Sequence, residues 1–347
     1  MRSLMERLRP ALRWEAGLAA VVVTVIIVGS SVSPQFLTGN NLFNVGLSNG
    51  EIAIMTLPMT LIIISGEIDL SVASILGMAS ALLGVLWSKG LPMPAIFVIV
   101  AIVGLAAGAF NGLLVTRLGL PSLAVTIGTL ALYRGIATIL LGPTTVANFP
   151  AAYTNLGVNG VPFTGNDVTY STFIFVVLAI IFGVVLHATP FGRSIYAMGA
   201  SVEAAQFAGI RVKRIKTILF MISGLICSLA GVLLTFRLDT AVQNNGLGLE
   251  LDVIAIVLLA GVSIFGGKGS MIGVVLGVLA FDGIQNALFL TNFNQEATGV
   301  VIGLLLLVSV FVPNMAAFSS RGRQLLARRR RTWPMSQAPA GGTDAGP

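Results

Sequence analysis

The stretch AIFVIVAIVGLAAGAFNGLLVT, residues 95–116, contains no charged side chain. A helix needs about 20 mostly apolar residues to cross the hydrocarbon core of a bilayer, so this stretch predicts a membrane-spanning helix. Comparable stretches recur along the chain, and spans one to ten are residues 16–32, 42–65, 72–87, 95–116, 122–141, 171–188, 215–236, 251–265, 271–290 and 296–313. The sequence therefore predicts an all-α membrane protein with about ten transmembrane helices, of which the third and eighth are short.

The composition excludes a large water-soluble domain. Hydrophobic residues make up 56% of the 347 residues and charged residues only 10%, whereas an ordinary soluble domain has about 25% charged residues. The excess of cations does not indicate nucleic-acid binding, because the cations lie at the ends of the apolar stretches. With one histidine, His187, and one cysteine, Cys227, a metal site or a Cys–His nucleophile pair is implausible.

The cations also orient the spans. All but three of the 20 Lys and Arg residues fall in segments that face the cytoplasm if the N-terminus is inside, and the exceptions are Lys89, Arg134 and Arg237. Cations are retained on the side that is not translocated during insertion. Because the number of spans is even, we expect both termini to be cytoplasmic.

Three regions follow from this orientation. Residues 1–15 form a basic cytoplasmic N-terminus, residues 16–315 the polytopic membrane domain, and residues 316–347 a basic and then disordered tail. Residues 1–32 could instead be a cleaved signal peptide, but the length of the apolar run and the nine spans after it favour an uncleaved first helix.

Two short matches suggest an internal repeat. Residues 67–69 (EID) precede span three and residues 250–252 (ELD) precede span eight, while residues 109–112 (AFNG) in span four resemble residues 280–283 (AFDG) in span nine. Spans two to five would then correspond to spans seven to ten, running in opposite directions. Inverted repeats of this kind are recurrent in transporters, with the pathway at their interface. Matches this short can also arise by chance, so the repeat stays a hypothesis.

Polar side chains at membrane depth are the candidates for lining or gating a pathway, because they are costly there unless paired or solvated. These candidates are Glu67, Asp69, Asn111, Arg134 and Asp282. Each has a structural alternative. The two acids before span three suit the positive end of its helix dipole, the arginine could pair with an acid, and the remaining two could form interhelical hydrogen bonds.

Residues 201–209, SVEAAQFAG, predict a short helix over 202–208 in the largest inward loop. Ser201 is a plausible N-cap, Glu203 lies in the first turn, and Gly209 can end the helix. A partner protein could bind a short exposed helix in a cytoplasmic loop and move it. The segment could also be a loop helix that has no partner.

Residues 261–270, GVSIFGGKGS, only superficially resemble a phosphate-binding loop. That pattern needs Gly at 262 and Ser or Thr at 269, where this chain has Val262 and Gly269. We interpret the segment as a tight inward turn, and we expect no ATPase activity on this chain.

Several phrases together resemble the permease subunits of ribose-type ATP-binding-cassette importers, over about residues 36–315. They are SGEIDLSV (65–72), TIGTL (126–130) with YRG (133–135), FGR (191–193), GGKG (266–269) and the E-A-A-x-x-x-G pattern of residues 203–209. This branch serves ribose, xylose, galactose, rhamnose and autoinducer-2. The chain departs from the common pattern at Glu67, so Asp69 is the better candidate for a shared functional position.

The resemblance implies a coupling helix that contacts a cytoplasmic ATPase, with Ser201, Glu203, Ala204, Ala205 and Gly209 as its signature. It further implies a second permease chain, identical or sister, and a periplasmic sugar-binding protein that docks on outward loops 142–170 and 237–250. No cofactor is expected on this chain, since ATP and Mg²⁺ would bind the partner ATPase. The location implied is the bacterial inner membrane.

Two other classes remain. An ion-coupled secondary transporter of a small polar solute would use Glu67, Asp69 or Asp282 as its titrating or ion-binding group, but it would not need an ATPase dock. A non-transport membrane scaffold is opposed, less strongly, by the inverted repeat.

Overall fold

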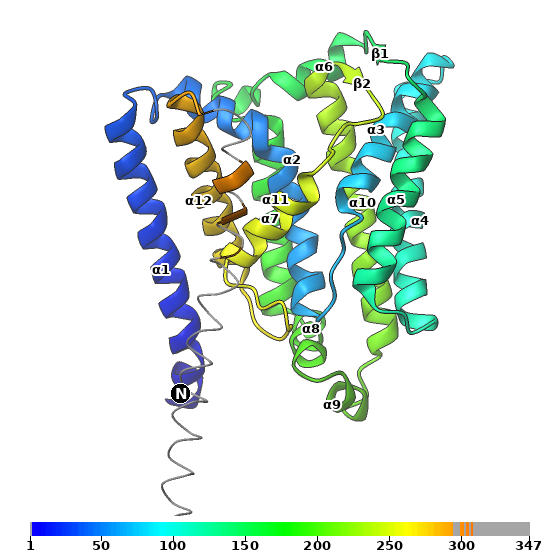
Figure 1. Ribbon diagram of the computed structural model, residues 1–347. Helices are drawn as coiled ribbons and strands as arrows, with labels where there is room; N and C mark the ends of the chain where they lie inside the picture. The colour runs from blue at the N-terminus through cyan, green and yellow to red at the C-terminus, as the bar shows by residue number, and fades with distance from the viewer. Residues whose placement is uncertain (1, 294–298, 302, 305–306, 308–347) are drawn as a thin grey trace, which may run out of the picture.

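The computed structural model describes residues 2–293, 299–301, 303, 304 and 307, and these form a helical bundle (Figure 1). Its elements are α1 (Arg2–Val32), α2 (Gly39–Ile64), α3 (Val72–Ser88), α4 (Met93–Arg117), α5 (Ser122–Leu141), β1 (Val146–Ala147), α6 (Ala151–Val158), η1 (Pro162–Thr164), α7 (Tyr170–Ala188), α8 (Pro190–Ala200), α9 (Val202–Phe207), α10 (Val212–Leu238), β2 (Thr240–Ala241), α11 (Leu249–Leu259) and α12 (Met271–Leu290).

Seven of the described helices are long and apolar enough to cross a membrane, namely α2, α4, α5, α7, α10, α12 and the Trp14–Val32 part of α1. The prediction of a helical, multi-pass membrane protein is therefore confirmed. The third and eighth spans are the shorter helices α3, with 17 residues, and α11, with 11 residues. The tenth expected span, 296–313, lies mostly outside the described residues, as does the expected tail at 316–347.

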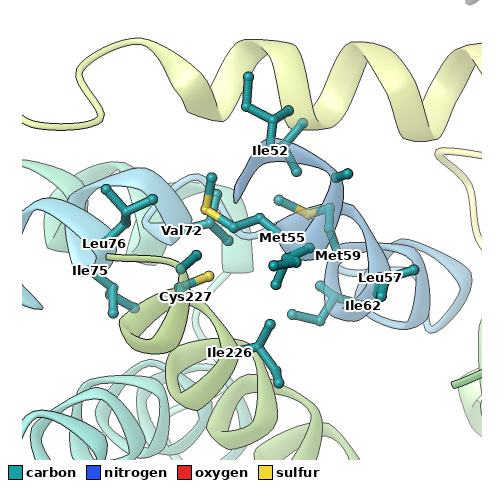
Figure 2. Close-up of a cluster of buried hydrophobic side chains, with 14 of the residues drawn as sticks. Ile52, Met55, Leu57, Met59, Ile62, Val72, Ile75, Leu76, Ile226 and Cys227 are labelled. Atoms are coloured by element: carbon teal, nitrogen blue, oxygen red, sulfur yellow. The ribbon is translucent and has the colours of Figure 1, made fainter. Parts of the chain in front are cut away.

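Helices α2 and α10 form the centre of the bundle. The inner part of α2, Gly50–Ile64, is buried throughout, and α10 packs against α2, α3 and α4. Figure 2 shows aliphatic and methionine side chains of α2 facing α3 and the Ile226–Cys227 turn of α10. This apolar contact holds the three helices together.

Helices α4 and α10 approach unusually closely because α4 carries Gly104, Gly108 and Gly112 on one face. A Cβ at Gly108 would overlap the carbonyl oxygen of Phe220, and one at Gly104 would lie 2.6 Å from the carbonyl oxygen of Gly224. Small residues at four-residue spacing let two backbones meet in this way.

A non-helical segment, residues 65–71, connects the end of α2 to the start of α3 inside the bundle. Backbone groups that are not in a helix must find other partners at membrane depth. Ser122 of α5 accepts from the amide of Ile68 at 3.1 Å, and Thr126 donates to the carbonyl oxygen of Ile68 at 3.3 Å. Helix α5 thus stabilises the break between α2 and α3.

The two ends of the bundle differ in character. Helices α8 and α9 and the N-terminal end of α1 lie at one end, and α6 with the small antiparallel pair β1–β2 lies at the other (Figure 1). The strands pair Val146 with Ala241 and Ala147 with Thr240, and so join the two loops expected to face outward.

Candidate functional site

Helix α9 forms where the sequence predicts a short loop helix, and it ends one residue earlier than expected. The Oγ of Ser201 caps it by accepting from the amide of Ala204 at 3.2 Å. Gly209 follows with a φ of +79°, a conformation that strongly favours glycine, and ends the helix. Ala205 is the only buried residue of α9 and anchors it to the protein.

The rest of α9 faces outward. Glu203 and Ala204 are exposed, and the Phe207 side chain is 93% exposed. Phe207 was not among the residues selected from the sequence. A large aromatic side chain at the tip of a short capped helix presents apolar area at low entropic cost to a partner.

Helix α8 connects α9 to the interior. A Cβ at Gly199 in the last turn of α8 would overlap the carbonyl oxygen of Ile64, the last residue of α2. The same carbonyl oxygen accepts from the amide of Gly267 at 2.8 Å. Residues 261–270, expected as a tight inward turn, thus join the ends of α2 and α8.

Tyr196 of α8 strengthens this junction. Its hydroxyl donates to the carbonyl oxygen of Gly269 at 2.6 Å. Burial, with a contribution from the nearby carboxylate of Glu15, raises the pKa of Tyr196 to about 12. The hydroxyl therefore keeps its proton, and its donor role, at neutral pH.

Asp69 lies at the centre of a buried polar cluster. Its Oδ1 accepts from the backbone amide of Ser71 at 3.0 Å and from the Ser71 hydroxyl at 2.6 Å, while its Oδ2 accepts from the Ser223 hydroxyl at 3.0 Å. These three residues are fully buried. The carboxylate therefore fixes the 65–71 segment both to the start of α3 and to α10.

Asn111 belongs to the same cluster. Its Nδ2 donates to the Ser71 hydroxyl at 2.7 Å, and its Oδ1 accepts from the Tyr133 hydroxyl at 3.2 Å. The structure thus brings together two predicted site residues, Asp69 and Asn111, and adds partners that the sequence does not reveal. Because the cluster is sealed, it holds helices together in this conformation and offers no open solute site.

Glu67 lies apart from this cluster and forms an ion pair with Lys216 near the start of α10. Both side chains are largely buried. The pair ties the 65–71 segment to α10 at the end of the bundle where α9 lies.

Arg134 contacts carbonyl oxygens, and among the described residues it forms no salt bridge with an acid. It donates to the carbonyl oxygens of Asn245 at 2.7 Å, Gly246 at 3.3 Å and Ala73 at 3.2 Å. The structure thus shows no salt bridge for Arg134 among these residues, although Glu250 lies near enough to interact electrostatically with its guanidinium. Arg134 instead joins the loop before α11 to the first turn of α3, which Gly77 permits because a Cβ there would lie 2.5 Å from the guanidinium.

Asp282 lies in α12, near a cavity of about 210 Å³ between α2 and α12. We call it the amide cavity, because five of its lining side chains are Asn41, Asn44, Asn49, Gln285 and Asn286. Asn49, one of the lining residues, lies close to the Asp282 carboxyl group. The sequence carried a signal for this site, since amides recur within an otherwise apolar span.

A second buried ion pair joins α2 to α10. The Nε of Arg237 lies 3.0 Å from Oε1 of Glu51, whose side chain is only 2% exposed. Glu51 is not among the residues predicted from the sequence, although an acid within an apolar span is itself a signal for a buried partner.

Comparison with known proteins places this geometry in context. The family described as "Branched-chain amino acid transport system / permease component" matches residues 41–310. The Autoinducer 2 import system permease protein LsrD of Escherichia coli (strain K12) is 31% identical over 325 residues, which cover 91% of this chain and 96% of that protein. The proteins of the same name from Shigella flexneri and Escherichia coli O157:H7 match with the same identity and coverage. No solved structure matches the chain.

Proposed function

Because the chain belongs to the family of branched-chain amino acid transport permease components, we propose that it is the membrane permease of an ATP-binding-cassette importer for a small hydroxylated solute. The resemblance to importer permeases drawn from the sequence motifs is confirmed by this family and by the autoinducer 2 import permeases. We place the importer in the bacterial inner membrane, with both termini cytoplasmic.

The observation that carries the proposal is helix α9 with its exposed Phe207. The helix is capped at both ends, is anchored through Ala205, and continues into α8, which contacts the end of α2. A partner that moves α9 would therefore move the junction at which the 65–71 segment begins. ATP itself, with Mg²⁺, would bind the partner ATPase and not this chain.

Transport would follow from two states of the permease. A ligand shifts a conformational equilibrium only by its differential affinity for the two states. The ATPase closed on ATP would favour one state through α9, and a solute-binding protein docked on the opposite end would favour one through loops 142–170 and 237–250. The β1–β2 pair joins these two loops, so a protein that docks on one loop would also restrain the other.

Two packing relationships support the inverted repeat as part of this proposal. Helix α3 packs against α10, and its expected counterpart α11 packs against α2. Both α3 and α11 are short helices that adjoin non-helical segments. Broken helices in corresponding positions of two halves are a recurrent transporter feature, with the pathway between them. A second permease chain, identical or sister, would complete the pathway.

The chemistry of the interior favours an uncharged solute over an amino acid. A zwitterion needs opposite charges held free to receive it. In the described part of the bundle, Glu51 pairs with Arg237 and Glu67 with Lys216, while Asp69 accepts three hydrogen bonds. In the same part of the chain, Arg134 is bound by three backbone carbonyl oxygens, and Glu250 keeps one buried oxygen without a partner. The name of the 31% identical relatives points the same way, toward autoinducer 2 or a related monosaccharide.

The test is ATPase stimulation in lipid nanodiscs. The chain would be purified with the ATPase encoded beside it, and hydrolysis measured with the neighbouring binding protein, empty or loaded with autoinducer 2, D-ribose or L-leucine. We expect stimulation by the protein loaded with one of the first two, and Phe207→Ala should abolish it. Ile139, 84% exposed on α5, supplies the control variant Ile139→Ala, since it lies outside α9 and outside the proposed docking loops.

If only the leucine-loaded binding protein stimulated ATP hydrolysis, the solute would be an amino acid and not a hydroxylated compound, while the importer proposal would stand. Failure to bind any ATPase, together with proton- or sodium-driven uptake by the chain alone, would instead favour a secondary transporter.

A further inference from the structure

We propose that the amide cavity between α2 and α12 is a binding site for the hydroxylated solute on its way through the permease. This inference rests on the proposed function, because it names where that solute would be held. It differs from the buried cluster around Asp69, which is sealed in this conformation.

The amides share one face of each helix. Asn41, Asn44 and Ser48 follow one another at spacings of three and four residues on α2, so they line one side of that helix. Gln285 and Asn286 lie one turn beyond Asp282 on α12. The two faces meet across the cavity, and Asp282 lies beside it, close to Asn49.

Their position in the membrane makes these side chains unusual. Asn49 lies ten residues after Gly39, the first residue of α2, which is roughly 15 Å along the helix axis. Amides and hydroxyls that face hydrocarbon are costly, whereas those that face a hydrated cavity are not. Asn44 and Ser48 are exposed in the described chain, and their polar groups are more favourable against water or protein than against lipid.

The donors and acceptors of the cavity are available. Among the described residues, no hydrogen bond is recorded for the side chains of Asn44, Ser48 or Gln285, nor for Asn286, which is only 7% exposed. Asn44, Gln285 and Asn286 each offer donors and an acceptor, which suits vicinal hydroxyl groups, whereas Asn41 already donates to the carbonyl oxygen of Phe36. Phe289 lies at the rim and is 75% exposed, so its ring can cover an apolar face of the solute.

The charge of the cavity restricts its ligand. No charged side chain is among its described lining residues. A site lined by neutral amides with one aromatic ring suits a small uncharged polyol or furanose, and it gives no cationic partner to a carboxylate group. With several modest hydrogen bonds and an open side, it would bind weakly enough to release its solute.

The first experiment measures uptake by the complete importer in proteoliposomes, with the binding protein supplying radiolabelled D-ribose or autoinducer 2. We expect Asn44→Leu and Asn286→Leu to lower uptake about tenfold, the factor that corresponds to about 1.4 kcal/mol of lost hydrogen bonding. The matched control is Asn40→Leu, since Asn40 is an exposed amide of the same helix that does not line the cavity. ATP hydrolysis stimulated by the loaded binding protein should persist in all three variants.

The outcomes separate the two proposals. If the native importer moves either probe and the cavity variants move it equally well, the cavity assignment fails while the importer proposal stands. If the native complex hydrolyses ATP but moves neither probe, the hydroxylated-solute class fails, and the assignment fails with it.

A second measurement does not depend on the solute. Because Cys227 is fully buried, the native chain gives an unreactive background for thiol labelling. Asn44→Cys should react with a membrane-impermeant maleimide, whereas Ile180→Cys, at a 62% exposed position of the apolar helix α7, should not. No labelling of Asn44→Cys, or its spontaneous cross-linking between two chains, would overturn the assignment.

Discussion

Gly199 and Ile64 touch so closely that no side chain fits between them. A Cβ on Gly199 would overlap the carbonyl oxygen of Ile64 and would lie 2.5 Å from the amide of Gly267. Gly199 precedes α9 by a few residues, and Ile64 ends the central helix α2. The contact therefore joins the chain just before the exposed helix α9 to the residue after which the 65–71 segment begins.

Replacement of Gly199 by valine should show whether the junction between α8 and α2 only stabilises the fold or also couples ATP hydrolysis to uptake. The backbone must shift to admit the side chain, at a cost of about 1–3 kcal/mol. We expect a lower midpoint of thermal unfolding in detergent, and uptake that falls more than ATP hydrolysis. The control is Gly135→Ala in α5, because no described atom lies within 4 Å of a Cβ at that position. Equal loss of uptake and hydrolysis in Gly199→Val would argue against a transmitting role.

The Glu51–Arg237 pair gives a prediction about stability. Removing one partner of a buried ion pair leaves an uncompensated charge and costs about 3–5 kcal/mol. Arg237→Gln should therefore lower the thermal midpoint clearly, because it leaves the Glu51 carboxylate, only 2% exposed, without its partner, and Glu51→Gln should lower it less because the remaining Arg237 side chain is 20% exposed. The double variant should be more stable than the sum of the single effects predicts. Additive effects in this cycle would show that the pair contributes no coupling.

Arg134 should resist conservative replacement. Its planar guanidinium reaches three carbonyl oxygens at once, and an ammonium group cannot match that geometry. In Arg134→Lys we expect faster amide hydrogen exchange around residues 243–248, together with a lower thermal midpoint. Arg193→Lys is the matched control, since Arg193 is exposed on α8. Unchanged exchange in the Arg134 variant would mean that the loop before α11 is held by other contacts.

Most of the helices could be predicted because their cause is local. Apolar length fixes a spanning helix such as α4, and the capping chemistry of Ser201 and Gly209 fixes α9 to within one residue. The shortness of α3 and α11 was also readable, since their apolar runs are short.

The contacts between helices could not be predicted in the same way. Asp69 meets Ser223 across 154 residues of sequence, and Arg134 meets Asn245 across 111. Such pairs depend on how the helices pack, which local pattern does not specify. Glu51 and the amides of α2 are a different case. They are polar residues within an apolar span, so the sequence alone could have identified them as candidates for buried or pathway-lining positions.

Asp69→Asn tests whether the central carboxylate does more than cap α3. An asparagine keeps the shape and can still accept from Ser71, while the Ser223 hydroxyl can turn to accept from the new amide group. The substitution removes the group's capacity to carry a charge, and hydrogen bonds to a charged acceptor are about twice as strong as neutral ones. We expect the thermal midpoint to fall slightly and uptake to fall about tenfold, a change that corresponds to about 1.4 kcal/mol. If uptake were unchanged in Asp69→Asn, the carboxylate would be a helix cap whose charge the transport cycle does not use.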